Sequence, residues 1–299
     1  MKPSPYQIAA FTHVARERSF SRAAEQLGVT QSSVTQHVAK LEKMMGTLLF
    51  IRRRDGVELT QSARELFDIS DRLRTLEQLV EEKIASYTDL SSGHLTIIAN
   101  APRPAMPVIS AFLARYPQIE IEFGLHDWTT AMTMLRSREV DVAVITEPDS
   151  FDGALVHELE RTPYLAHMRR EHPMAGSSTL SLADLAETTL ILPEDGSFTQ
   201  RIVRQKTHLY DLRFERVVKT RTFPVMKEAV LHGVGIGLML ENSMFPSQHI
   251  IAVPVAEMPE AYRHCLVTLR DKGNLRLVQS FIDVARQGVF LANHPAVLP

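Results

Sequence analysis

The hydrophobic positions of residues 21–43 recur at the spacing of two short helices joined by a tight turn. The apolar side chains of the two helices are Ala23, Ala24, Leu27, Val34, Val38 and Leu41. Gly28 ends the first helix, and the hydroxyl of Thr30 can cap the second by accepting a free backbone N–H. The pattern predicts a helix-turn-helix unit.

The outward side of the second helix is polar and rich in groups that can bind DNA. It carries Gln31, Ser32, Ser33, Thr35, Gln36 and Lys40. Glutamine and serine side chains can read base edges in the major groove, and a lysine can meet a phosphate. We therefore expect this helix to read double-stranded DNA. The alternative is an ordinary helix pair whose outer face is solvated.

A hairpin signal follows the two helices. Residues 49–60 contain two apolar, β-favouring flanks around Asp55 and Gly56, a turn dipeptide, with Arg52, Arg53 and Arg54 beside it. A β-hairpin wing next to a helix-turn-helix places such arginines against the sugar-phosphate backbone or in the minor groove. Together with Arg22 they complete the predicted DNA contacts, although three arginines can also be a solvated edge.

Charge is distributed unevenly along the 299 residues. The whole chain has a net charge of −2, with 33 basic and 35 acidic residues, but residues 1–60 carry nine basic and five acidic side chains. Their net charge is therefore +4, which leaves −6 for the remainder. A basic end on an acidic body is typical of a protein that touches DNA at one end.

Residues 6–66 resemble the N-terminal domain of LysR-type transcriptional regulators. The resemblance is carried by Phe11, residues 19–24 (SFSRAA), Leu27, residues 31–35 (QSSVT), Leu41-Glu42, Gly46, Leu49-Phe50, Arg52 and Leu59-Thr60. It extends more loosely over nearly the whole length. The chain departs from the family pattern at Ser32, where proline is usual, and at Ser62-Ala63, where Ala-Gly is frequent.

Residues 61–88 predict one long helix of about seven turns with an apolar seam. Its positions, three and four apart, are Leu66, Ile69, Leu73, Leu76, Val80, Lys83 and Tyr87, and Ile84 can substitute at the charged break. A second copy of the same helix is the economical partner, because two recognition helices can read an inverted repeat. The alternative is that the stripe packs on its own subunit. The family resemblance implies the same linker helix and dimers that pair into tetramers.

From His94 onward the pattern changes to alternating strands and helices. The predicted strands are 94–99, 119–125, 141–145, 164–168, 189–192, 215–220, 236–240 and 265–269; the predicted helices are 104–114, 129–138, 199–206, 224–232 and 274–286. A βαβαβ order requires a parallel sheet, and its recurrence predicts two α/β halves with a hinge. The family resemblance implies the same periplasmic-binding-protein-like body, with the chain returning to its first half near Leu266.

Ligands of open parallel sheets bind beyond the carboxyl ends of the strands, where helices begin. Helix N-termini there offer free N–H groups, which favour a small anion such as a carboxylate or phosphonate. The predicted effector-binding residues are Asn100, Ala101, Arg103, Trp128, Thr129, Thr146, Ser197, Phe198, Thr199 and Phe223. Arg103 would add a full charge, with Trp128 and Phe223 as apolar walls. Alternatively, Ser197 and Thr199 are plain helix caps and Trp128 is a core residue.

Enzyme and metal signals are weak. The glycines of residues 233–237 follow a helix and precede a strand, the reverse of the dinucleotide-binding order. The 12 histidines show no metal-binding spacing, and the single cysteine, Cys265, excludes an intramolecular disulfide and a cysteine-cluster zinc site. We expect no catalytic residue, metal or cofactor. An enzyme with an appended DNA-binding domain would need an acid/base or nucleophile set, which is not found.

The sequence thus predicts an α/β protein with an all-α N-terminal part in four segments. They are a winged helix-turn-helix domain (1–60), a coiled-coil dimerisation helix (61–90), effector subdomain 1 (91–161 and 266–299) and effector subdomain 2 (162–265). The expected partners are an inverted-repeat operator, an organic anion, a second copy forming a homodimer and then a homotetramer, and RNA polymerase. Lacking a signal-peptide core or an apolar run of membrane length, the chain is expected in the cytoplasm. A solute-binding transport protein would need export and has no use for residues 1–88.

Overall fold

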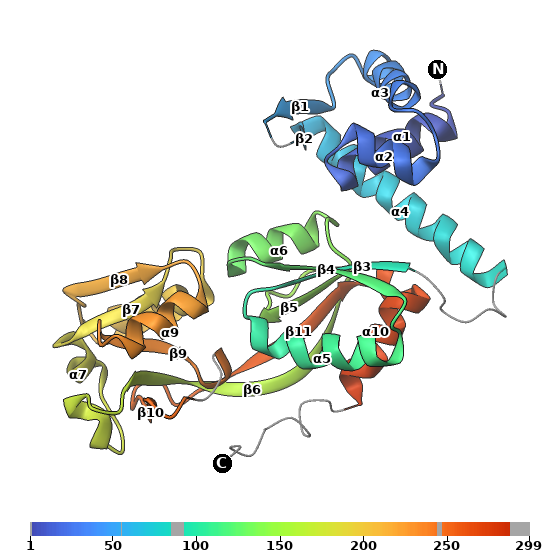
Figure 1. Cartoon of the computed structure of the whole chain (residues 1–299). Helices are drawn as coiled ribbons and strands as arrows, with labels where there is room; N and C mark the ends of the chain where they lie inside the picture. Colours follow the sequence, from blue (N-terminus) through green and yellow to red (C-terminus); the bar gives the residue numbers. More distant parts are fainter. Residues whose placement is uncertain (1, 55, 85–92, 244–246, 288–299) are drawn as a thin grey trace. The chain divides into compact units, whose positions relative to one another are not determined.

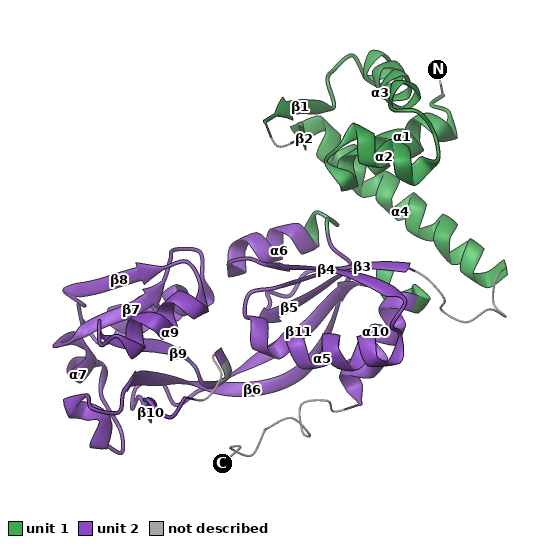
Figure 2. Ribbon diagram, in the orientation of Figure 1, with its two compact units in different colours: residues 1–89, 136–139, 271–276 green, residues 90–135, 140–270, 277–299 purple. Residues whose placement is uncertain are grey.

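The computed structural model describes residues 2–54, 56–84, 93–243 and 247–287, and the chain divides into two compact units (Figures 1 and 2). Unit 1 comprises residues 1–89, 136–139 and 271–276, and unit 2 comprises residues 90–135, 140–270 and 277–299. Tyr87, the last position of the predicted seam, lies outside the described residues.

Unit 1 contains the predicted winged helix-turn-helix and long helix. Its elements in chain order are α1 (Pro5–Glu17), α2 (Phe20–Leu27), α3 (Gln31–Met45), β1 (Phe50–Arg53), β2 (Gly56–Leu59) and α4 (Gln61–Ile84). Strands β1 and β2 form an antiparallel hairpin in which Phe50 pairs with Leu59. The inner faces of the helices meet in a core that includes Phe11, Val34 and Val38, all buried.

Local chemistry accounts for the helix boundaries of unit 1. Gly28 has φ +64° and ends α2, and the Thr30 Oγ1 accepts the Ser33 N–H at 3.2 Å at the start of α3, as predicted. Ser4 and Gln7 form a reciprocal capping box at α1, an element that the sequence analysis did not assign.

A buried ion cluster holds residues 136–139 and 271–276 in unit 1. The Asp71 side chain on α4 is fully buried, and its carboxylate lies 3.2 Å from Arg16 Nε and 2.7 Å from Arg138 Nε. Burial alone would raise the pKa of Asp71, but the surrounding cations, Arg16 and Lys272 foremost, hold it below its ordinary value. The inner face of α4 is therefore fixed by paired charges as well as by apolar packing.

Unit 2 contains a nine-stranded sheet in the order β4-β3-β5-β11-β6-β9-β7-β8, with β10 paired to β6. One half consists of β3 (Gly93–Ala99), α5 (Pro102–Arg115), β4 (Ile119–Leu125), α6 (Trp128–Arg136) and β5 (Val142–Thr146); the other consists of β7 (Thr189–Pro193), α8 (Phe198–Leu209), β8 (Arg216–Thr220), α9 (Phe223–Leu231) and β9 (Ile236–Leu240). The three strands of each half are parallel, which confirms the two α/β halves.

Two long antiparallel strands, β6 (Ala154–Arg169) and β11 (Ala261–Leu269), join the halves (Figure 1). They pair from Leu269 opposite Ala154 to Ala261 opposite Pro163, with a register shift between His264 and Cys265. The subdomain boundaries predicted at 161/162 and 265/266 fall inside these strands. The sequence analysis predicted only residues 164–168, in the second half of β6. It missed the first half because apolar and polar residues alternate less clearly there.

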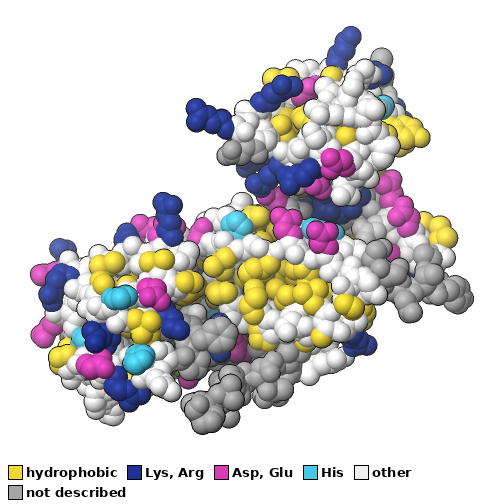
Figure 3. Space-filling model, viewed as in Figure 1, with side chains coloured by type: hydrophobic (Ala, Val, Ile, Leu, Met, Phe, Trp, Pro, Cys, Tyr) yellow, Lys and Arg dark blue, Asp and Glu magenta, His cyan; other side chains and the backbone are white. Residues whose placement is uncertain are grey.

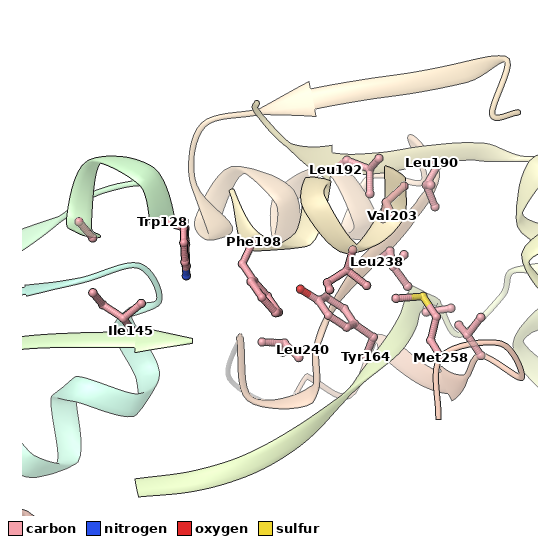
Figure 4. Packing of buried hydrophobic residues seen from close by; sticks show 14 of the residues in the cluster. Trp128, Ile145, Tyr164, Leu190, Leu192, Phe198, Val203, Leu238, Leu240 and Met258 are labelled. Atoms are coloured by element: carbon pink, nitrogen blue, oxygen red, sulfur yellow. The ribbon is translucent and has the colours of Figure 1, made fainter. Parts of the chain in front are cut away.

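The remaining elements of unit 2 are short or lie at its edge. They are the 3₁₀ turn η1 (Pro173–Gly176), α7 (Leu182–Ala186), η2 (Glu241–Ser243), β10 (Ile250–Pro254) and α10 (Arg276–Arg286); η3 (Lys272–Asn274) belongs to unit 1. The sequence analysis assigned none of them except α10. The main core of unit 2 spans both halves and includes Ile145, Tyr164 and Leu238 (Figure 4). In the described ranges no helix has the length and apolarity that a membrane crossing needs.

Candidate functional site

The outward face of α3 is open on unit 1. Gln31, Ser32, Thr35, Gln36 and Lys40 are exposed, whereas Val34, Val38 and Leu41 on the other side are buried. Lys and Arg side chains project from the part of unit 1 that carries α3, β1 and β2 (Figure 3). The unit therefore presents a polar helix beside cations, a surface that suits a major groove and its phosphates.

Some of the predicted DNA contacts have partners within unit 1. The Gln31 Oε1 accepts the hydroxyl of Ser21 at 2.9 Å, which fixes the side chain at the start of α3. Arg22 donates to the Glu17 carbonyl at 2.6 Å, and Arg53 Nε lies 2.9 Å from Glu58 Oε2 across the hairpin. These arginines are exposed, so their ion pairs are weak enough to exchange for phosphate. Arg52 and Arg54 are exposed as well.

The wing is fixed to the helices through its turn. Val57 donates its N–H to the Arg18 carbonyl at 3.1 Å, and Arg18 itself has φ +50°. Gly56 has φ +136°, and a Cβ there would clash with the same carbonyl oxygen. Only glycine allows this approach, so Gly56 fixes the position of the hairpin, and with it the arginines of β1, against the helices. Asp55 lies outside the described residues.

The predicted seam on α4 is exposed. The exposed fractions of its apolar side chains are 66% for Ile69, 46% for Leu73, 56% for Leu76, 58% for Val80 and 80% for Ile84. Leu66 is half-buried against the unit 1 core, and Lys83 is exposed. The opposite face of α4, with Phe67, Asp71 and Thr75, is buried. Unit 1 therefore does not pack this stripe against itself.

Unit 2 has a cavity of about 320 Å³ between its two halves. The residues that line it are Asn100, Ala101, Leu125, His126, Asp127, Trp128, Thr146, Tyr164, Pro193, Glu194, Ser197, Phe198, Thr199, Arg221, Thr222, Phe223, Leu240 and Ser243. Apart from Tyr164 on β6, they lie at or just beyond the carboxyl ends of β3, β4, β5, β7, β8 and β9, so the strand order brings together segments that are distant in sequence. Trp128 faces Phe198 and Tyr164 across this region (Figure 4).

Two predicted effector-binding residues do not line the cavity. Burial lowers the pKa of Arg103, and the negative charges of Glu160 and Glu241 act in the opposite direction. Thr129 instead donates its hydroxyl and its N–H to the Gly196 carbonyl, at 3.1 and 3.2 Å. The other predicted residues, Asn100, Ala101, Trp128, Thr146, Ser197, Phe198, Thr199 and Phe223, all line it.

The expectation of several free helix N-termini holds for only part of the cavity. Asp127 Oδ1 accepts the N–H groups of Thr129 and Thr130 at 3.0 and 3.1 Å and so caps α6. Ser197 caps α8 in the same way through the Gln200 N–H. Helices α5 and α9 have no side-chain cap, so their first-turn N–H groups can meet a ligand, apart from those that proline removes.

The floor of the cavity is a chain of hydrogen bonds. Asn100 Oδ1 accepts the Thr146 N–H at 2.9 Å, and the Thr146 Oγ1 lies 3.1 Å from His264 Nδ1. The other ring nitrogen of His264 lies 3.0 Å from Thr162 Oγ1 on β6. Ser243 is 4% exposed and lines the cavity, and its hydroxyl has no hydrogen-bond partner among the described residues. It can bond to a ligand without losing a contact.

Sequence reasoning missed His264, Tyr164 and Ser243. Ser243 could have been found, because it follows β9 as Asn100 follows β3, and the same strand-end rule selects it. His264 lies within a buried strand, and its spacing gives no signal. Among the described residues no group of three or more His, Cys, Asp and Glu side chains could hold a metal ion.

Burial makes two histidines of unit 2 sensitive to pH. It lowers the pKa of His264 and that of His167 from 6.5 to about 4. Between these values the unfolded chain binds protons that the folded chain does not. The contribution of each histidine to the free energy of unfolding is therefore fully present above pH 6.5 and is lost as the pH falls toward 4. We expect a loss of about 3 kcal/mol per histidine over this window.

The measurement for this prediction is urea unfolding at a series of pH values from about 7.5 to about 4.5, which covers most of the range between the two pKa values. His264→Gln should flatten the slope of unfolding free energy against pH, whereas His232→Gln, which replaces an exposed histidine, should leave it unchanged. An unchanged slope in His264→Gln would contradict the assignment of the buried neutral form.

Family models match both parts of the chain. Residues 5–64 match the bacterial regulatory helix-turn-helix protein model of the lysR family, and residues 88–289 match the LysR substrate binding domain. The chain belongs to the LysR family. This family consists of DNA-binding transcriptional regulators with an effector-binding domain. The protein is therefore a LysR regulator and not an enzyme.

Individual relatives are similar over most of the chain. The RuBisCO operon transcriptional regulator of Allochromatium vinosum is 27% identical over 277 residues, covering 91% of this chain and 92% of that protein. A full-length OxyR variant from Pseudomonas aeruginosa has a TM-score of 0.79 at 19% identity, over 96% of this chain and 95% of that one. The CcmR regulatory domain of Synechocystis PCC6803 in complex with 2-PG has a TM-score of 0.59 at 22% identity, over 66% of this chain and 98% of that one.

Proposed function

We propose that this LysR regulator reads an inverted-repeat operator with α3 of two subunits, and that a small organic anion in the unit 2 cavity sets its activity. The exposed polar face of α3, above a buried apolar face, is the observation that carries the DNA-binding half. Gln31, Ser32, Ser33, Thr35 and Gln36 would contact base edges. Arg22, Lys40, Arg52, Arg53 and Arg54 would contact the backbone.

The second copy would pack on the α4 seam. Five large apolar side chains exposed at spacings of three and four favour a helix of the same kind as partner. Such a dimer would hold two recognition helices on one operator. We further propose that dimers pair into tetramers, that RNA polymerase is contacted at the promoter, and that the protein acts in the cytoplasm.

For the effector we infer a single carboxylate-like group on a partly apolar body. The first-turn N–H groups of α9, the Asn100 amide and the Ser243 hydroxyl can solvate one negative charge. The charged side chains that line the cavity are Asp127, Glu194 and Arg221, and Arg221 lies 3.3 Å from Glu194 and is 86% exposed. Two carboxylates against one paired cation disfavour a second negative charge on the ligand. The CcmR regulatory domain, which has a related fold, is in complex with 2-PG.

The ligand would act by binding one closure state of the two halves better than the other. It can shift their equilibrium only by that difference in affinity. Because β6 and β11 connect the halves, a change in closure would alter how dimers pair and so the spacing of recognition helices on DNA.

A thermal-shift screen tests the effector proposal, since a ligand that binds the native state raises Tm. The probes are small monocarboxylates, matched dicarboxylates, phosphonates and 2-PG. We expect a monocarboxylate to give the largest shift, and Asn100→Leu or Thr146→Val to abolish it. Ser110→Ala, on the exposed side of α5, is the matched control. Equal shifts in all variants would place the ligand elsewhere.

A further inference from the structure

One arginine links the two halves of unit 2 beside the cavity, through contacts with two of the rings that line it. Arg201 lies on α8, and its guanidinium carbon is 4.1 Å from the ring centroid of Trp128 on α6 and 4.8 Å from that of Phe198. Its Nη1 lies 3.6 Å from Asp149 Oδ1, in the segment after β5. The side chain therefore starts in one half and contacts a ring and a carboxylate of the other.

Trp128 is firmly held by its own half. Its Nε1 donates to the Thr146 carbonyl at 2.8 Å, and the residue is 8% exposed. Phe198 is held by the second half and packs edge to face on Tyr262, with centroids 5.3 Å apart. The two aromatic rings thus form opposite walls, and the guanidinium of Arg201 lies against both.

A second contact between the halves lies beside the first. Thr129 donates its N–H and hydroxyl to the Gly196 carbonyl at 3.2 and 3.1 Å. A Cβ on Gly196 would lie 2.8 Å from Asp127 Oδ1, so the two loops are in direct van der Waals contact. Neither Arg201 nor Thr129 is among the residues that line the cavity.

We propose that Arg201 and Thr129 form a latch that holds the two halves of unit 2 together beside the cavity. The latch rests on the proposed effector site, whose access it regulates. A ligand enters when the guanidinium leaves Trp128 and the Thr129–Gly196 hydrogen bonds open. Stacking on two rings makes the guanidinium contact comparable to a partly desolvated cation–π pair, so its loss shifts the ratio of open to closed forms by about 2- to 30-fold.

The chain contains one tryptophan, Trp128, so its fluorescence reports on the latch directly. In full-length protein without added ligand, Arg201→Ala is expected to raise acrylamide quenching of Trp128 and to speed amide exchange in residues 126–131 by about 2- to 30-fold. Arg204→Ala is the matched control, because Arg204 lies on the same helix and pairs with Asp195 in the same half. It should change neither signal.

Removing Arg201 also uncovers the tryptophan ring, so a second variant separates the two effects. Thr129→Val breaks the hydroxyl hydrogen bond and leaves Arg201 over the ring, and it too should raise both signals. Faster quenching in Arg201→Ala alone, with unchanged amide exchange in both variants, would overturn the latch. If both variants raise quenching and amide exchange but none of the screened acids raises Tm, the latch is supported and the anionic effector is contradicted.

Discussion

Leu73→Lys should convert the regulator from a dimer to a monomer. Leu73 lies in the middle of the exposed α4 seam, where the substitution removes an apolar side chain from each subunit and places an ammonium group in the proposed contact. Losing about 2 kcal/mol per subunit would raise the dimer Kd on the order of a thousand-fold. Sedimentation velocity at micromolar concentration measures this change.

The DNA-binding consequence follows from the lost dimer. A monomer should bind a full inverted repeat no more tightly than a half-site, because the second recognition helix is no longer held nearby. Glu81→Lys is the control, since it places a lysine at an exposed α4 position outside the seam and makes an even larger charge change of +2 per subunit. A Leu73→Lys protein that sediments as the unchanged protein does would eliminate the α4 seam as the dimer contact.

Gln36→Ala should relax operator specificity with little loss of general DNA affinity. Gln36 is exposed on the outward face of α3, and a glutamine amide that bonds a base edge in the major groove contributes about 1–3 kcal/mol of discrimination. The variant should therefore lose roughly 10- to 100-fold of preference at one base position in each half-site. The measurement is competition binding, at fixed salt, with operators selected from a random duplex library by the unchanged protein.

Arg53→Ala provides the contrast. As a predicted contact with the DNA backbone, Arg53 should contribute equally to the affinity for all duplexes. Its loss should lower the magnitude of the slope of log K against log salt by about one.

If Gln36→Ala kept the full base preference, α3 would contact DNA without reading that position.

Local spacing determined most of unit 1. The interval between Val34, Val38 and Leu41 fixes which face of α3 is buried, and therefore which face remains for DNA. The same reasoning predicted the seam from Leu66 to Tyr87, of which Ile69, Leu73, Leu76 and Val80 are exposed, because a helix turns by a constant angle per residue whatever surrounds it. It could not predict that Asp71, a charged residue on the same helix, is fully buried, since this needs cations from residues distant in the chain.

The sequence predicted the residues of the cavity only in part. Alternating strands and helices predicted two parallel α/β halves, and the strand-end rule selected Asn100, Thr146 and Phe198, because chain connectivity fixes the edge of the sheet where such segments lie. The direction in which each side chain turns was decided only by the fold. Thr129 bonds to the Gly196 carbonyl, because partners far apart in sequence meet only after the halves have packed, and Arg103 is not among the residues that line the cavity.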